Sequence, residues 1–104
     1  MAMRHWRKAG WLVKFGIFET EQFIENRTRD FEGPGTRIRK KLSEYVYPQL
    51  RSNPYFGKNI KKLKNYRPDT WRYKIGGYRF FYEINEKERI VYMLAADSRK
   101  DSYR

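Results

Sequence analysis

Hydrophobic and polar residues alternate along residues 71–85, WRYKIGGYRFFYEIN, on both sides of a Gly76-Gly77 pair. Alternation with a period of two is typical of a strand with one buried face, and two glycines between such segments favour a two-residue hairpin turn. One face of this hairpin is therefore expected to be apolar and aromatic, and it carries Trp71, Tyr73, Ile75, Tyr78, Phe80 and Tyr82. The opposite face carries Arg72, Lys74, Phe81 and Arg79.

The polar face of the predicted hairpin places two cations opposite each other. A two-residue turn at the glycines pairs Lys74 with Arg79 and Arg72 with Phe81. Like charges directly opposite each other in a sheet are destabilising, by up to about 1 kcal/mol. We therefore predict that an anion is bound at this face.

Two helices are predicted before the hairpin. Residues 11–18 are rich in strand formers, and Glu19-Thr20 then gives a helix start for a short helix at about 20–30. A break at Gly33-Pro34-Gly35 precedes a second, amphipathic helix that ends before Asn53-Pro54. Its apolar residues recur at helical spacing and are Ile38, Leu42, Tyr45, Val46 and Leu50. Pro48 lacks an N–H group, so the helix is expected to kink or restart there.

The remaining segments complete an α+β order of elements. Residues 57–69, GKNIKKLKNYRPD, are predicted to form a cationic loop, and the apolar run 89–96 a strand covered on both faces. A charged tail follows at 97–104. We expect one domain over residues 1–104, with residues 1–10 flexible, in which two antiparallel helices pack on a twisted antiparallel sheet in the order β-α-α-β-β-β.

Composition limits the classes of partner and chemistry. The chain has 24 Lys and Arg against 12 Asp and Glu, a net charge of +12, so a polyanion or an acidic protein is the expected partner. Solubility alone is the alternative explanation of this charge. Without cysteine, disulfides, zinc-thiolate sites and thiol nucleophiles are excluded. No stretch approaches the ~20 apolar residues of a membrane span, and we expect a cytoplasmic protein with no membrane partner.

Few residues are candidates for catalysis. His5 is the one histidine, and it lies in the segment expected to be flexible. Asp97 and Glu83 are better explained as ion-pair partners of nearby cations than as bases. No cluster of metal ligands is present in the sequence, so neither a metal nor a cofactor is expected.

The cationic residues, with an aromatic ring among them, suit RNA. Arginines bind phosphate oxygens, aromatic rings stack on bases, and the ribose 2′-hydroxyl is a nucleophile toward its own 3′-phosphate. The candidate catalytic residues are Lys74, Arg79, Arg99 and Tyr103. The candidate RNA-binding residues are Arg72, Lys74, Phe81, Lys61, Lys62 and Lys64.

Three segments resemble the RelE/ParE superfamily of toxins from bacterial toxin-antitoxin systems. They are WRYKIGGYRFFYEI at 71–84, IVYMLAADSR at 90–99 and RKDSYR at 99–104. For the RelE-like branch the resemblance implies a ribosome-dependent mRNA endonuclease that contacts 16S rRNA, needs no metal and is neutralised by an acidic antitoxin. It also implies that Arg79 and Arg99 stabilise the reacting phosphate, while Tyr103 or Lys74 transfers protons.

The resemblance leaves alternatives open. Thr70 occupies a position where some RelE enzymes have lysine, and Tyr103 lies closer to Arg99 than the corresponding tyrosine does in typical members. The ParE branch shares the fold but inhibits DNA gyrase. A non-catalytic module that binds RNA or the ribosome is a third interpretation, and it predicts salt-sensitive binding without cleavage.

Overall fold

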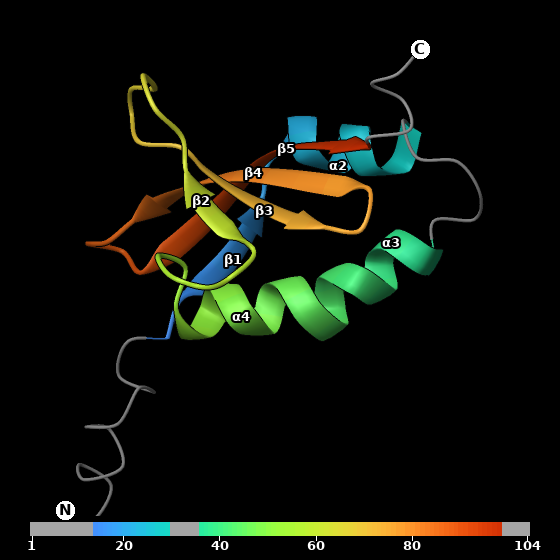
Figure 1. The fold of residues 1–104 in the computed structure, drawn as a ribbon, viewed down its shortest axis with the longest axis horizontal. Coiled ribbons are helices and arrows are strands. Elements are labelled where there is room, and N and C mark those ends of the chain that lie inside the picture. Colours follow the sequence, from blue (N-terminus) through green and yellow to red (C-terminus); the bar gives the residue numbers. More distant parts are fainter. Residues whose placement is uncertain (1–13, 30–35, 99–104) are drawn as a thin grey trace, which may run out of the picture.

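The computed structural model describes residues 14–29 and 36–98. A five-stranded sheet forms its centre (Figure 1). Across the sheet the strands lie in the order β1 (Gly16–Glu19), β5 (Ile90–Ser98), β4 (Tyr78–Asn85), β3 (Trp71–Ile75) and β2 (Ile60–Lys62). Strand β1 pairs with β5 in parallel, and every other pair is antiparallel. The predicted antiparallel sheet is thus confirmed for β3, β4 and β5, and the first strand makes the sheet mixed.

Two helical segments connect β1 to the rest of the sheet. The first is α2 (Glu21–Arg29), and the second is a longer helix built from α3 (Thr36–Lys41), a π-helical turn η2 (Leu42–Val46) and α4 (Tyr47–Ser52). In the π-helical turn the Tyr47 N–H donates to the Leu42 carbonyl, five residues back. The regular hydrogen bonding therefore changes just before Pro48, where the sequence predicted an irregularity.

The hydrophobic core lies between these helices and one face of the sheet, which we call the inner face. The long helix buries every fourth residue, namely Ile38, Leu42, Val46 and Leu50. These side chains join Phe23 of α2 and the inner-face residues Tyr73, Phe80, Tyr82, Val91, Met93 and Ala96 in one cluster. Tyr45 was predicted to belong to this apolar stripe, but it lies beside the row of buried residues and is 53% exposed.

The predicted hairpin register is confirmed in all five pairs. Lys74 lies opposite Arg79, and Arg72 lies opposite Phe81. Gly76 has φ of +60°, whereas its neighbour Gly77 does not have a positive φ. A positive φ at the first central residue alone is the pattern of a type II′ turn, which matches the twist of the flanking strands.

One segment predicted to be a loop contains a strand. Residues 57–69 were predicted to be a loop, but Ile60–Lys62 forms the edge strand β2, paired with β3. Its three residues are too few for a periodic signal, and Ile60 alone joins the core. The predictions for residues 1–10, for strand residues 11–13, for the Gly33-Pro34-Gly35 break and for the tail beyond Ser98 lie outside the described residues.

Candidate functional site

The sheet face opposite the core, which we call the outer face, collects cations near the β3–β4 turn. Because side chains alternate along each strand, the ladder register fixes which residues share this face. Lys61 of β2 lies beside Arg72 of β3, which lies beside Phe81 of β4. The next row holds Lys74, Arg79 and Asp97. Four cations from three strands are thereby brought together.

The polar face of the hairpin was predicted to bind an anion. Asp97, a residue of the chain itself, supplies one. It lies directly opposite Arg79, and the Arg79 guanidinium donates to Asp97 Oδ2 at 2.5 Å. Both side chains are partly exposed, Arg79 at 32% and Asp97 at 39%. The carboxylate offsets the repulsion between Lys74 and Arg79 and fixes the direction of the guanidinium. Within the described residues, Lys61, Arg72 and Lys74 have no ion-pair partner.

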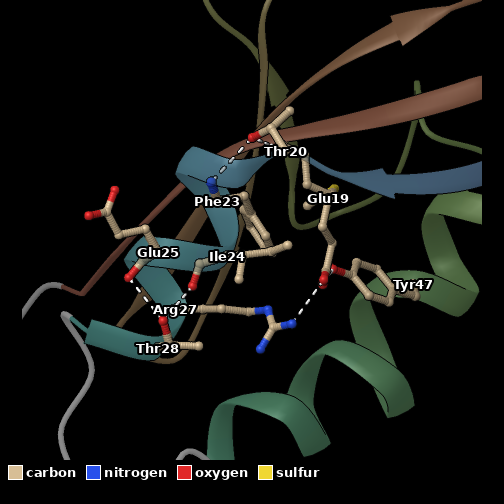
Figure 2. A network of polar contacts seen from close by, with 9 residues as sticks. Glu19, Thr20, Phe23, Ile24, Glu25, Arg27, Thr28 and Tyr47 are labelled. Atoms are coloured by element: carbon tan, nitrogen blue, oxygen red, sulfur yellow. Dashed lines mark hydrogen bonds and ion pairs between the residues drawn. The ribbon is translucent and has the colours of Figure 1, made fainter.

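Helix α2 holds the part of β5 that carries Asp97. Strand β1 ends opposite Met93, so the rest of β5 has no strand on that side. Thr20 bridges the two elements: its hydroxyl donates to the Met93 carbonyl at 2.8 Å. The same hydroxyl accepts from the Phe23 N–H at 3.2 Å (Figure 2). Asn26, which is buried, accepts the Ala96 N–H through Oδ1 at 3.1 Å. These bonds satisfy backbone groups that a neighbouring strand would otherwise pair.

A second polar cluster joins β1, α2 and α4 (Figure 2). Glu19 accepts from Arg27 through Oε1 at 2.9 Å and from the Tyr47 hydroxyl through Oε2 at 2.5 Å. Burial, followed by the hydrogen bond to Glu19, raises the pKa of the Tyr47 phenol far above its usual value. The phenol therefore stays protonated at neutral pH. We interpret this cluster, which borders a pocket of about 480 Å³, as a structural link between the helices.

The structure brings together part of the predicted site. Five of the predicted residues share the outer face: Lys61, Arg72, Lys74, Arg79 and Phe81. Lys62 does not, because alternation turns it to the opposite side, where its Nζ lies 5.9 Å from the Trp71 ring centroid. Lys64 follows β2 and is exposed. Arg99 and Tyr103 lie outside the described residues.

Sequence reasoning missed the aromatic part of the outer face. Phe18 of β1 lies opposite Tyr92 of β5, and their ring centroids are 5.6 Å apart in an edge-to-face arrangement. Glu83 of β4 lies opposite Tyr92 in the same row. The run 89–96 was read as buried on both faces, which concealed the alternation of Tyr92 with the buried Val91 and Met93. That alternation was the available signal.

Residues 14–29 and 36–98 contain no group of three His, Asp or Glu side chains arranged to hold a metal ion. None of the helices in that part of the chain has the length and apolar content needed to cross a membrane.

Comparisons with known proteins identify the family. The family model of the ParE toxin of the type II toxin-antitoxin system, parDE, matches residues 20–103. No curated protein matches the chain.

Solved structures of RelE toxins have the same fold. The RelBE2 toxin-antitoxin complex of Mycobacterium tuberculosis is 22% identical, with a TM-score of 0.68 over 83% of this chain and 99% of that one. The RelE-RelB complex of Pyrococcus horikoshii is 20% identical, with a TM-score of 0.64 over 83% and 96% of the two chains. The isolated E. coli RelE toxin is 20% identical, with a TM-score of 0.63 over 81% and 83%.

The family match covers most of the chain, and the element order and sheet agree with the RelE-like structures. The resemblance noted in the sequence is therefore confirmed at the level of family and fold. The chain belongs to the ParE toxin family of type II toxin-antitoxin systems, within the RelE/ParE superfamily.

Proposed function

We propose that this toxin is a ribosome-dependent mRNA endonuclease and that its outer face binds the scissile phosphate. The observation that carries the proposal is the cluster of Lys61, Arg72, Lys74 and Arg79 around Phe81 on one sheet face. Arginine and lysine contacts to phosphates supply most of the affinity of proteins for nucleic acids. An aromatic ring among them offers a surface on which a base can stack.

The proposed reaction uses the RNA as its own nucleophile. The 2′-hydroxyl loses its proton, its oxygen bonds to the adjacent phosphorus, and the bond from phosphorus to the 5′-oxygen of the next nucleotide breaks. Negative charge grows on the phosphate oxygens, and Arg79, which stays protonated at neutral pH, stabilises it. Asp97 orients Arg79 for this task. Arg99 is proposed to add a second charge, and Tyr103 or Lys74 to transfer the protons.

The proposed partners follow from the charge and from the relatives. The M. tuberculosis and P. horikoshii structures are toxin-antitoxin complexes. A cognate antitoxin with acidic side chains would complement the net charge of +12. The remaining cations, including Lys62 and Lys64, are proposed to contact mRNA or 16S rRNA in the cytoplasm. No metal or cofactor takes part in the proposed reaction.

Inhibition of DNA gyrase is the second candidate function. The observation in its favour is that the matching family model describes ParE toxins, whereas the structural relatives are named RelE. A shared fold does not distinguish between these activities, since function depends on the residues placed upon it.

Two assays on the purified toxin separate the candidates. Programmed ribosomes are incubated with the toxin and message ends are mapped by primer extension, while gyrase supercoiling is measured in parallel. We expect cleaved message and unaffected supercoiling. Arg79→Ala should reduce single-turnover cleavage by about two orders of magnitude or more, because it removes a charge that stabilises the transition state. Lys87→Ala removes an exposed cation beyond the other end of β4 and is the control. Intact message with inhibited gyrase would refute the endonuclease.

A further inference from the structure

Beyond the cations, the outer face carries an exposed aromatic pair. Phe18 is 54% exposed, although it lies in a strand and contacts Tyr92 edge to face. Tyr92 is half-buried, and its hydroxyl donates to Glu88 at 2.9 Å, which holds the ring in place. Large exposed aromatic side chains that neighbour a cationic surface are typical of sites where nucleobases stack.

The aromatic pair is continuous with the proposed phosphate site. Glu83 lies four residues after Arg79 on β4, which corresponds to about 13 Å along the strand. Phe81 lies between them on the same face. Each nucleotide of a duplex strand advances about 3.4 Å along the helix axis, and an extended single strand advances further, so a few nucleotides span this distance. An RNA held by its phosphate at Arg79 can therefore reach the aromatic pair.

Glu83 gives the aromatic pair a chemical preference. It is half-buried beside Tyr92, and its side chain has no hydrogen bond or ion pair among the described residues. A carboxylate accepts hydrogen bonds but does not donate them, so it suits the exocyclic amino group of cytosine and related bases. The same carboxylate would face the O4 acceptor of uracil unfavourably. It would also disfavour a phosphate, so a base is the part of the RNA that fits here.

Building on the proposed function, we propose that Phe18, Tyr92 and Glu83 form a nucleobase subsite for single-stranded RNA, selective for a base with an exocyclic amino group. The ring of the base stacks on the exposed Phe18 side chain and contacts the half-buried Tyr92 ring beside it. Its amino group donates to Glu83. The subsite thus fixes the register of the strand relative to the phosphate at Arg79.

The test measures binding of short, cleavage-resistant RNA by fluorescence anisotropy. RNAs of about six nucleotides carry cytosine, uracil or an abasic residue at successive positions. Wild-type protein should show one position at which the abasic residue weakens binding by about five-fold or more, the lower end of the range for one stacked base. Phe18→Leu keeps an apolar side chain but removes the ring, and it should abolish this sensitivity. Tyr45→Leu is the matched control, because Tyr45 is 53% exposed but lies on the long helix.

Glu83→Gln tests the selectivity separately. Wild-type protein should bind cytosine about three- to ten-fold more tightly than uracil at the sensitive position, and the variant should lose this difference because an amide also donates. Abasic positions without effect, or equal losses in Phe18→Leu and Tyr45→Leu, would overturn the subsite alone. Absence of RNA binding by wild-type protein would overturn the proposed function together with it. Self-association lost on Phe18→Leu without a change in RNA binding would instead assign the pair to a protein interface.

Discussion

Replacing Tyr47 with phenylalanine tests whether its hydroxyl binds Glu19 as a buried, protonated donor. The substitution removes the 2.5 Å hydrogen bond while keeping the ring that packs in the long helix. Hydrogen bonds to charged groups contribute about 1.5–3 kcal/mol to stability. Glu19 keeps its bond to Arg27 and is 23% exposed, so we expect the lower figure, about 1.5 kcal/mol, at pH 7.

The Tyr47 hydroxyl also makes the difference in stability between wild type and Tyr47→Phe depend on pH. Burial raises the pKa of Tyr47 in the folded protein, whereas an unfolded tyrosine ionises near pH 10. Above pH 10 the unfolded chain therefore loses a proton that the folded protein retains, and the free energy of unfolding falls by about 1.4 kcal/mol for each further pH unit. The contribution of Tyr47 is complete below pH 10 and lost above it. The Tyr47→Phe variant lacks this loss.

Urea denaturation at pH 7, 9, 10 and 11 measures both effects. The variant should be less stable than wild type by about 1.5 kcal/mol up to pH 9, and the two should become nearly equal by about pH 11. Tyr45→Phe is the control, because Tyr45 is exposed and its change should stay within about 0.5 kcal/mol. A difference between Tyr47→Phe and wild type that stays constant from pH 7 to 11 would refute the assignment.

Three further substitutions test the turn, the support of β5 and the charge of the outer face. Gly76→Ala should lower the free energy of unfolding by about 1–2 kcal/mol because its φ is +60°, whereas Gly77→Ala should be close to neutral; equal urea midpoints for the two would contradict this. Asn26→Ala leaves a buried backbone N–H of β5 without its acceptor, so we expect a loss of about 1–3 kcal/mol and a lower melting temperature by calorimetry. Asp97→Asn removes the carboxylate that pairs with Arg79 and raises the net charge of the outer face by one, so the logarithm of RNA affinity should fall more steeply with the logarithm of salt concentration, by about one unit of slope. Asp69→Asn, which disrupts an exposed ion pair away from the outer face, should leave that slope unchanged, and equal slopes in both variants would argue against phosphate binding at the outer face.

The hairpin could be predicted to the residue because local chemistry specifies it. Two glycines fix the turn, and strict alternation then fixes which side chains share a face, so Arg72, Lys74, Phe81 and Arg79 were correctly placed together. The long helix was predicted for the same reason, since its buried residues recur at a regular spacing. Both the hairpin and the long helix are specified by residues that lie close together in the sequence.

Asp97 was expected to pair with a nearby cation, but the identity of its partner and the contact of Phe18 with Tyr92 depend on strand register. Asp97 meets Arg79 only because β5 pairs with β4 in one register, and that register contains an irregularity between Phe81 and Tyr82. Phe18 meets Tyr92 only through the parallel pairing of β1 with β5. The turn at 86–89 joins β4 to β5 but does not reveal the irregularity further along the pair, and no turn joins β1 to β5. The residues of the site on the β3–β4 hairpin could therefore be predicted from the sequence. Their exact neighbours on β1 and β5 could not.

The pairing of β1 with β5 also governs when this toxin becomes a folded molecule during its own synthesis. Strand β1 and helix α2 are made early, yet the strand that they pack against is the last of the described strands to be translated. Contacts between segments so far apart in sequence form slowly, because the intervening chain must first be ordered. A nascent chain that lacks β5 has neither the aspartate that orients Arg79 nor the row that completes the outer face. We expect the outer face to assemble only once translation of the sheet is finished, which leaves an antitoxin time to act.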